Sequence, residues 1–259
     1  MPPTTKVLFF IYAGVLGAAV GSFLNVCLAR LPAGESLVRP RSRCPACGTP
    51  IPWFDNIPVL SWLALRGKCR ECRRSISFQY PAVELLTAAI WVGMALHYGP
   101  TWKALQGSVL FSVLLAISLI DARHYLIPDA LSLGGLGAGL ALALLPGPPS
   151  LLTSLIGAVL GFGVLLVVGL LGEWVFKKPA MGGGDIKMMG MVGAFLGPAG
   201  AMLTIFLGAL AGTLIFAPIS LKTKKEVPFG VFLGLGAAVA FLFGDWLVDW
   251  YSRVVFGSV

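Results

Sequence analysis

Long apolar runs, broken by short polar segments, extend along most of the chain. A run of roughly 18–20 apolar residues is long enough to cross a bilayer as a helix. Two of the runs, 131–145 and 186–197, are shorter, and a short segment can form a half-span where protein buries its backbone. We therefore predict an all-α polytopic membrane protein with about eight transmembrane helices, or about seven as the alternative, at residues 7–29, 82–99, 104–120, 131–145, 151–176, 186–197, 199–220 and 229–251.

The composition agrees with a membrane protein. The chain is 57% hydrophobic and only 12% charged, and its mean hydropathy is +0.88. A soluble domain of 259 residues would need far more charge to cover its surface. The first run, residues 7–29, is too long for the apolar region of a signal peptide and lacks a small-residue cleavage site, so we expect it to remain as the first span.

The positive charges predict the orientation of the chain in the membrane. The net charge is +8, and membrane proteins concentrate Lys and Arg in cytoplasmic loops. If residues 30–81 are cytoplasmic and the spans alternate, nearly all Lys and Arg lie inside, Lys224 and Lys225 among them. The exceptions are Lys6, Lys103 and Arg253. The charge therefore reflects membrane topology, and we expect the lipid bilayer, but no nucleic acid, as a partner.

The segment 30–81 is polar and basic, and it carries most of the cysteines. Two C-x-x-C pairs, with 21 residues between them, nearly match the spacing of a four-cysteine zinc ribbon. Four thiolates close a tetrahedral site without an open position, so zinc would be structural here. Two disulfides are disfavoured in the reducing cytoplasm, whereas metal-free or redox-active thiols remain an alternative. The candidate ligands are Cys44, Cys47, Cys69 and Cys72.

Two aspartates lie where a charge is costly. Asp121 ends a long apolar run, and Asp185 follows residues 182–184, all glycine, before another apolar segment. An ionisable side chain in a span is a functional candidate because its burial is expensive, and both lie at cytoplasmic ends in this topology. Two carboxylates that meet there would share a proton and supply a general base and a general acid. Asp129, which follows Pro128 and opens an apolar helix, is expected instead to be an N-cap.

Other chemistries have less support from the residues. The histidines, His97 and His124, form no H-E-x-x-H helix, and no G-x-S-x-G elbow occurs. A proton-coupled transporter with a cytoplasmic zinc module is the alternative function, because intramembrane carboxylates also relay protons. Transport sites usually lie near the bilayer midplane between paired repeats, and no internal repeat is evident in this sequence.

Ordered motifs run along most of the chain, at residues 21–26 (GSFLNV), 30–32 (RLP), 43–48 (RCPACG), 56–62 (NIPVLSW), 66–69 (RGKC), 80–84 (YPAVE), 121–129 (DARHYLIPD), 181–187 (MGGGDIK) and 227–230 (VPFG). Together they resemble the prepilin peptidases, also called type IV leader peptidases, which are GxGD-type intramembrane aspartic peptidases. The chain departs from the family pattern at Met188, where Leu is common, and at Val231, where Pro is common.

The resemblance implies an aspartic endopeptidase with Asp121 and Asp185 as the catalytic pair. Its substrates would be type IV prepilins and the pseudopilins of type II secretion, cut at the cytoplasmic face of the bacterial inner membrane. Many members also N-methylate the new N-terminus with S-adenosylmethionine, an activity associated with the cysteine-containing domain, and Gly67 and Lys68 are the candidate positions for that cofactor. We accordingly divide the chain into a first span, 1–29, a cytoplasmic zinc-ribbon-like domain with the four cysteines, 30–81, and a transmembrane aspartic peptidase core, 82–259.

Overall fold

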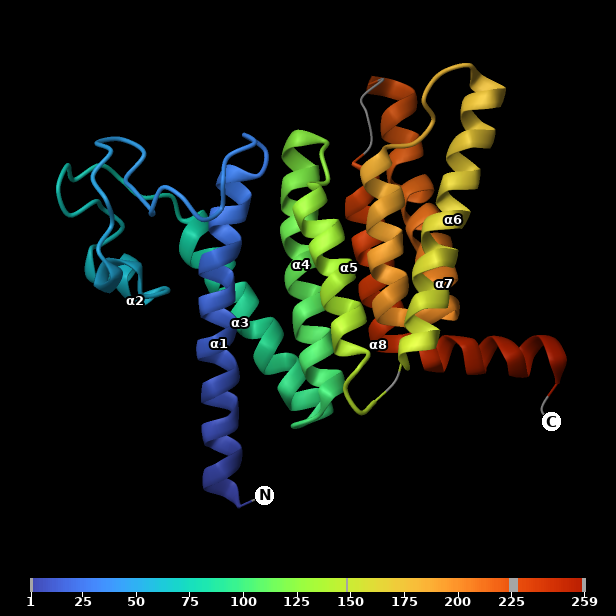
Figure 1. Ribbon diagram of the computed structural model, residues 1–259, viewed down its shortest axis with the longest axis horizontal. Helices are drawn as coiled ribbons and strands as arrows, with labels where there is room; N and C mark the ends of the chain where they lie inside the picture. Colours follow the sequence, from blue (N-terminus) through green and yellow to red (C-terminus); the bar gives the residue numbers. More distant parts are fainter. Residues whose placement is uncertain (1, 148, 224–227, 258–259) are drawn as a thin grey trace. The chain divides into compact units, whose positions relative to one another are not determined.

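The computed structural model describes residues 2–147, 149–223 and 228–257, and Figure 1 shows a chain built from helices. Within these ranges there is no β-strand, so the all-α prediction is confirmed. Lys224, Lys225 and Val227 lie outside the described residues. The elements are α1 (Pro3–Arg30), the 3-10 helix η1 (Trp53–Asn56), α2 (Leu60–Ala64), α3 (Gln79–Tyr98), α4 (Trp102–His124), α5 (Asp129–Leu142), α6 (Leu151–Phe176), α7 (Gly183–Thr223) and α8 (Phe229–Phe256).

Among the described residues, six helices are long and apolar enough to cross a membrane, namely α1, α3, α4, α6, α7 and α8, while α5 is a shorter apolar helix. The chain is therefore a multi-pass membrane protein. The predicted segments 186–197 and 199–220 are joined in α7, which bends at Gly197 with φ 69° and ψ −174°. Because Pro198 has no N–H to donate into a helix, the sequence reads as two segments on either side of this bend.

The chain forms two compact units, residues 1–112 and residues 113–259. In the first unit α1 packs against α3. A Cβ atom at Gly21 of α1 would lie only 2.7 Å from the Cα atom of Glu84 in α3. Close approach through small residues is a common way for membrane helices to associate, and it holds these two helices together at the level of Glu84.

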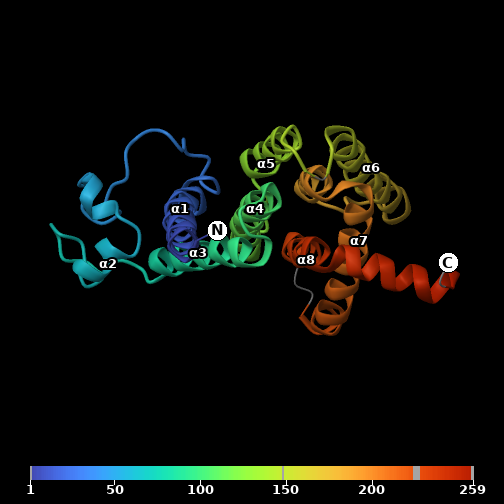
Figure 2. The same cartoon turned by 90° about the horizontal axis from the view of Figure 1, so that it is seen from below.

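In the second unit α7 contacts α5, α6 and α8, and Figure 2 shows it beside α6 and crossing α8. Met189, Val192 and Phe195 of α7 are fully or almost fully buried. Gly157 of α6 lies so close to Gly193 of α7 that neither position has room for a Cβ atom. α7 is therefore the central helix of this unit, and the glycine-rich segment with Asp185 forms its first turn.

Candidate functional site

Asp121 lies in the last turn of α4 and is 5% exposed. The helix ends at His124. The Tyr125 amide donates to the Asp121 carbonyl oxygen at 2.9 Å, and the left-handed conformation of Tyr125 (φ 52°) then turns the chain out of the helix. The Asp121 carboxylate Oδ2 accepts a hydrogen bond from the amide of Val231 at 3.3 Å, and the Gly230 amide lies close enough to stabilise the charge of this carboxylate. The first turn of α8 thus holds Asp121 through backbone donors, as helix N-termini hold anions.

Asp185 lies in the first turn of α7, where a negative charge is favoured by the helix dipole. Its amide donates to the Gly182 carbonyl oxygen at 3.1 Å. Its Oδ1 atom is buried and has no hydrogen-bond partner among the residues that the structure describes. The Asp121 and Asp185 carboxylates are close enough to interact electrostatically. The structure therefore brings together the two aspartates that the sequence singles out.

Ile127 lies where the end of α4 and the starts of α7 and α8 meet at these carboxylates. Its side chain is buried in the segment between α4 and α5. A Cβ atom at Gly184, at the start of α7, would lie 2.7 Å from Ile127 Cβ. A Cβ atom at Gly230, at the start of α8, would lie 2.7 Å from Ile127 Cδ1 and 2.9 Å from Asp121 Oδ2. Both glycines are needed for this close approach, and each one places a helix N-terminus beside the aspartates.

Asp129 has a different role from the expected one. Pro128 is the N-cap of α5 and Asp129 is the first helical residue, without a side-chain cap hydrogen bond. Its carboxylate pairs instead with Lys187 of α7, with Nζ–Oδ distances of 2.8 and 2.7 Å. The N-cap prediction is wrong because the fixed extended conformation of Pro128 already starts the helix. The carboxylate is thereby free to join α5 to α7 two residues beyond Asp185.

The four cysteines in the segment between α1 and α3 form one cluster. Their Sγ atoms all lie within 4.8 Å of one another, and those of Cys44 and Cys72 are 3.9 Å apart. Zn–S bonds of about 2.3 Å in a tetrahedron separate the sulfurs by about 3.8 Å. All four are free thiols, so neither predicted C-x-x-C pair is closed into a disulfide, and the donor set and spacing fit a zinc ion.

Each pair is part of a tight turn, which we call a cysteine knuckle (residues 44–48 and 69–73). The amide of Gly48 donates to the Cys44 carbonyl oxygen at 2.9 Å, and that of Arg73 to the Cys69 carbonyl oxygen at 3.1 Å. Gly48 and Arg73 both have positive φ, 73° and 57°. The same backbone turn at both pairs points the thiols toward a common centre, as a closed metal site requires.

Hydrogen bonds from the side chain and backbone of Thr49 lower the pKa of Cys47 to about 6. The Thr49 hydroxyl oxygen lies 3.3 Å from Cys47 Sγ. A thiol with this pKa is mostly thiolate at neutral pH, and the thiolate is the form that ligates a metal.

Comparison with known proteins shows which protein family the chain resembles. Residues 15–98 match the bacterial peptidase A24 N-terminal domain, and residues 108–217 match the type IV leader peptidase family. A prepilin leader peptidase/N-methyltransferase of Aeromonas hydrophila is 37% identical over 94% of this chain and 94% of its own length. The chain belongs to the type IV leader peptidase family.

Two more relatives of this type IV leader peptidase carry the same description. The protein of Pseudomonas aeruginosa is 38% identical over 92% of this chain and 92% of its own length. That of Myxococcus xanthus is 39% identical over 85% of this chain and 66% of its own length. No solved structure matches the chain.

In this leader peptidase, Gly67 packs against an aromatic ring and Lys68 lies at the surface. Gly67 has φ 64°, and a Cβ atom there would lie 2.8 Å from Cζ2 of Trp62 in α2. Its lack of a side chain therefore serves packing against Trp62. Lys68 is exposed beside Cys69. Gly67 and Lys68 alone do not form a cradle for the nucleoside part of S-adenosylmethionine.

Sequence reasoning missed three elements around Asp121 and Asp185 in this type IV leader peptidase. The amides of Gly230 and Val231 are backbone donors, which leave no side-chain signature. Ile127 looks like any apolar residue in a loop. The signal that could have found Gly230 is its place in the motif at residues 227–230, to which the sequence analysis gave no role.

Proposed function

We propose that this chain removes the leader peptides of type IV prepilins and pseudopilins and methylates the new N-terminus. The observation that carries the proposal is the meeting of Asp121 and Asp185 at the ends of apolar helices in a member of the type IV leader peptidase family. The names of the relatives, prepilin leader peptidase/N-methyltransferase, support both reactions. The basic loops support a bacterial inner-membrane location with the aspartates at the cytoplasmic face.

Peptide hydrolysis follows from two carboxyl groups that hold one proton between them. The ionised group accepts a proton from water as the water oxygen attacks the scissile carbonyl carbon. The protonated group then gives its proton to the leaving nitrogen as the C–N bond breaks. Asp121 is held by backbone amides, whereas Asp185 Oδ1 has no partner among the described residues. We therefore assign Asp185 as the carboxylate that contacts the attacking water. Asp121, fixed by the backbone amides, holds the second carboxyl group in position beside it.

The substrate must be extended at the bond that is cut. Peptide groups in a helix are engaged by their own hydrogen bonds. A prepilin is cut after a glycine and before a long apolar helix, as the family resemblance implies, and glycine makes local unwinding easier. The apolar helix can lie among the spans, which leaves the basic leader on the cytoplasmic side.

The four cysteines would hold a structural zinc ion that closes the small polar domain. A segment of about 50 residues has too little apolar core to be stable without such a staple. For methyl transfer, S-adenosylmethionine supplies an electrophilic methyl group when bound. We propose Lys68 as a contact for its carboxylate and Gly67 as the residue that sets the position of Lys68 above Trp62.

The test is cleavage of a purified prepilin by the protein in detergent. Mass spectrometry of the product reads both the cut and the methyl group. Asp121→Asn and Asp185→Asn should each abolish cleavage, whereas Asp249→Asn, an exposed carboxylate of α8, should not. If either dyad variant retains wild-type activity, the assignment of the pair is wrong. Cleavage in detergent needs no ion gradient and separates this function from proton-coupled transport.

A further inference from the structure

Large apolar side chains are exposed in the polar segment between α1 and α3, where a water-soluble loop would avoid them. Trp53 of η1 is 81% exposed, and Leu60 and Leu63 of α2 are 65% and 58% exposed. Leu60 and Leu63 are three residues apart in one helix, so they lie on the same face. We call residues 53–64, which contain η1, α2 and the turn between them, the interfacial segment.

The interfacial segment lies beside the spans instead of beyond their ends. The amide of Val59, directly before α2, donates to Glu84 Oε2 of α3 at 2.7 Å. Glu84 in turn packs against Gly21 of α1, which is nine residues before the polar end of that helix at Arg30. At 1.5 Å per residue, Gly21 lies about 13 Å before Arg30 along α1, and Val59 is joined to that level of the spans through the Glu84 side chain. Figure 1 shows α2 at the height of the upper half of α1.

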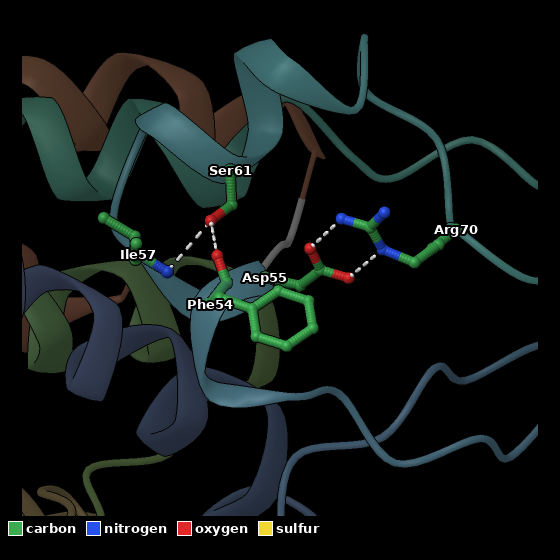
Figure 3. Close-up of polar contacts among 5 residues, drawn as sticks. All are labelled: Phe54, Asp55, Ile57, Ser61 and Arg70. Atoms are coloured by element: carbon green, nitrogen blue, oxygen red, sulfur yellow. Dashed lines mark hydrogen bonds and ion pairs between the residues drawn. The ribbon is translucent and has the colours of Figure 1, made fainter.

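Side chains of the protein satisfy backbone hydrogen-bonding groups of this segment that water would otherwise satisfy. Ser61 Oγ accepts from the Ile57 amide at 3.0 Å and donates to the Phe54 carbonyl oxygen at 2.9 Å (Figure 3). Glu84 satisfies the Val59 amide in the same turn. Irregular backbone at membrane depth is tolerated only where protein groups satisfy its hydrogen bonds. In a loop surrounded by water, solvent would do this without buried side chains.

The surroundings of the segment match a lipid boundary on both sides. At the same level of the spans, exposed apolar side chains continue the surface, namely Phe23 of α1 and Leu85 and Leu86 of α3. On the polar side, Arg70 is held by Asp55 through two hydrogen bonds of 2.7 and 2.6 Å (Figure 3). Two further exposed basic residues, Arg73 and Arg74, follow in the same domain. Such residues complement the anionic headgroups of a cytoplasmic leaflet.

We propose that the interfacial segment is a membrane-binding element that lies in the boundary between lipid headgroups and acyl chains. Trp53, Leu60 and Leu63 contact the acyl chains, and the basic residues contact the headgroups. Short apolar elements held in this way anchor a domain to one leaflet without crossing it. The cysteine domain is then tied to the membrane surface at a third place, besides the ends of α1 and α3.

Depth-dependent quenching tests the proposal on the full-length protein. A fluorescent amino acid is introduced in place of Leu63 and, as a matched control in the same domain, in place of the exposed Glu71. The protein is placed in nanodiscs of phosphatidylglycerol and phosphatidylcholine whose acyl chains carry bromine. We expect strong quenching at position 63 and little at position 71. Equal quenching at the two positions would overturn the proposal.

A second arm separates lipid from a protein partner. A synthetic peptide with the apolar helix of a pilin is added to the labelled nanodiscs. If lipid covers the segment, quenching at position 63 is unchanged. If the peptide abolishes quenching at position 63, the surface is a substrate groove and the proposal is wrong. The same measurement with the probe in place of Trp53 gives an independent reading if position 63 does not tolerate the change.

Discussion

The two aspartates reach one site from different helix termini, and their settings are not equivalent. Asp121 is at the C-terminal end of α4, where the helix dipole disfavours a negative charge, and the amides of Gly230 and Val231 compensate for this. Asp185 is at the N-terminal end of α7, where the dipole itself favours the charge. The sequence predicts both residues, because carboxylates next to apolar runs are costly. It could not predict the compensating amides.

Gly230→Ala should lower the rate of leader cleavage by about 10- to 100-fold, because small misplacements of catalytic groups have effects of that size. The new Cβ atom would lie 2.9 Å from Asp121 Oδ2 and 2.7 Å from Ile127 Cδ1. Gly137→Ala in α5 is the matched control, since an added Cβ atom there meets nothing within 4 Å. The assay is cleavage kinetics on protein of unchanged thermal stability. A wild-type cleavage rate for Gly230→Ala would show that the close contact of Gly230 with Asp121 and Ile127 is not needed for cleavage.

Asp129→Asn should keep most of the peptidase activity. The Asp129–Lys187 pair is exposed, with 58% and 36% of the two side chains accessible, and exposed pairs contribute about 1 kcal/mol or less. Asp129→Lys should cost more, because two cations would then face each other, and adding Lys187→Glu should restore the loss. Cleavage rates and melting temperatures of the three variants measure this. An inactive Asp129→Asn variant would instead make Asp129 part of the chemistry.

At the scale of elements, the break in α7 shows what hydrophobicity can and cannot predict. Two apolar segments separated by Gly197 and Pro198 are visible in the sequence, whereas their continuity in one bent helix is not. The bend depends on contacts with α6, where Gly157 packs against both Gly193 and Gly197. The four-residue spacing of Gly157 and Gly161, and of Gly193 and Gly197, indicates a close helix contact, but it does not say which two helices meet.

Gly197→Ala should lower the free energy of unfolding by about 1–3 kcal/mol, since its φ of 69° and ψ of −174° belong to a region that only glycine adopts readily. The added Cβ atom would also lie 3.0 Å from Thr153 Cγ2. Gly163→Ala in α6, with nothing within 4 Å of the new atom, should be neutral. Melting temperatures in detergent compare the two, and equal values would contradict the strain.

The two cysteine knuckles should bind one zinc ion per chain. Cys44→Ser should release it, because three thiolates do not close the tetrahedron, whereas Cys27→Ala should not, because Cys27 is buried in α1 away from the cluster. Elemental analysis of purified protein gives the stoichiometry. Chelation should loosen the knuckles without abolishing cleavage by the aspartates. A zinc content near zero in the wild-type protein would exclude the metal.

At the scale of the whole molecule, the length of each apolar run is enough to predict the all-α membrane fold. It does not predict which helices pack together. Every span is apolar on several faces, so hydrophobicity does not say which helices pack together. The structure divides the chain at residues 112 and 113, inside α4, where the sequence offers no boundary. The cysteine cluster belongs to the first unit and both aspartates to the second.

This division predicts that the two proposed activities separate genetically. Lys68→Ala should lower methylation of a pre-cleaved pilin by about tenfold or more, the effect of losing a hydrogen bond to a charged group, without slowing cleavage. Arg66→Ala, an exposed neighbour, should affect neither reaction. Product masses in the presence of S-adenosylmethionine report both steps at once. A parallel loss of cleavage in Lys68→Ala would contradict the separation.

The Val231 amide has a consequence for how tolerance to substitution is interpreted at this position. All amino acids except proline keep a main-chain N–H, so saturation mutagenesis would record position 231 as permissive. Proline, common here in the family pattern, is the replacement that deletes the donor, and the amide of Gly230 would then hold Asp121 alone. Permissive behaviour in such a map would therefore conceal a direct contact with the Asp121 carboxylate, and Val231→Pro is the one variant that removes this donor.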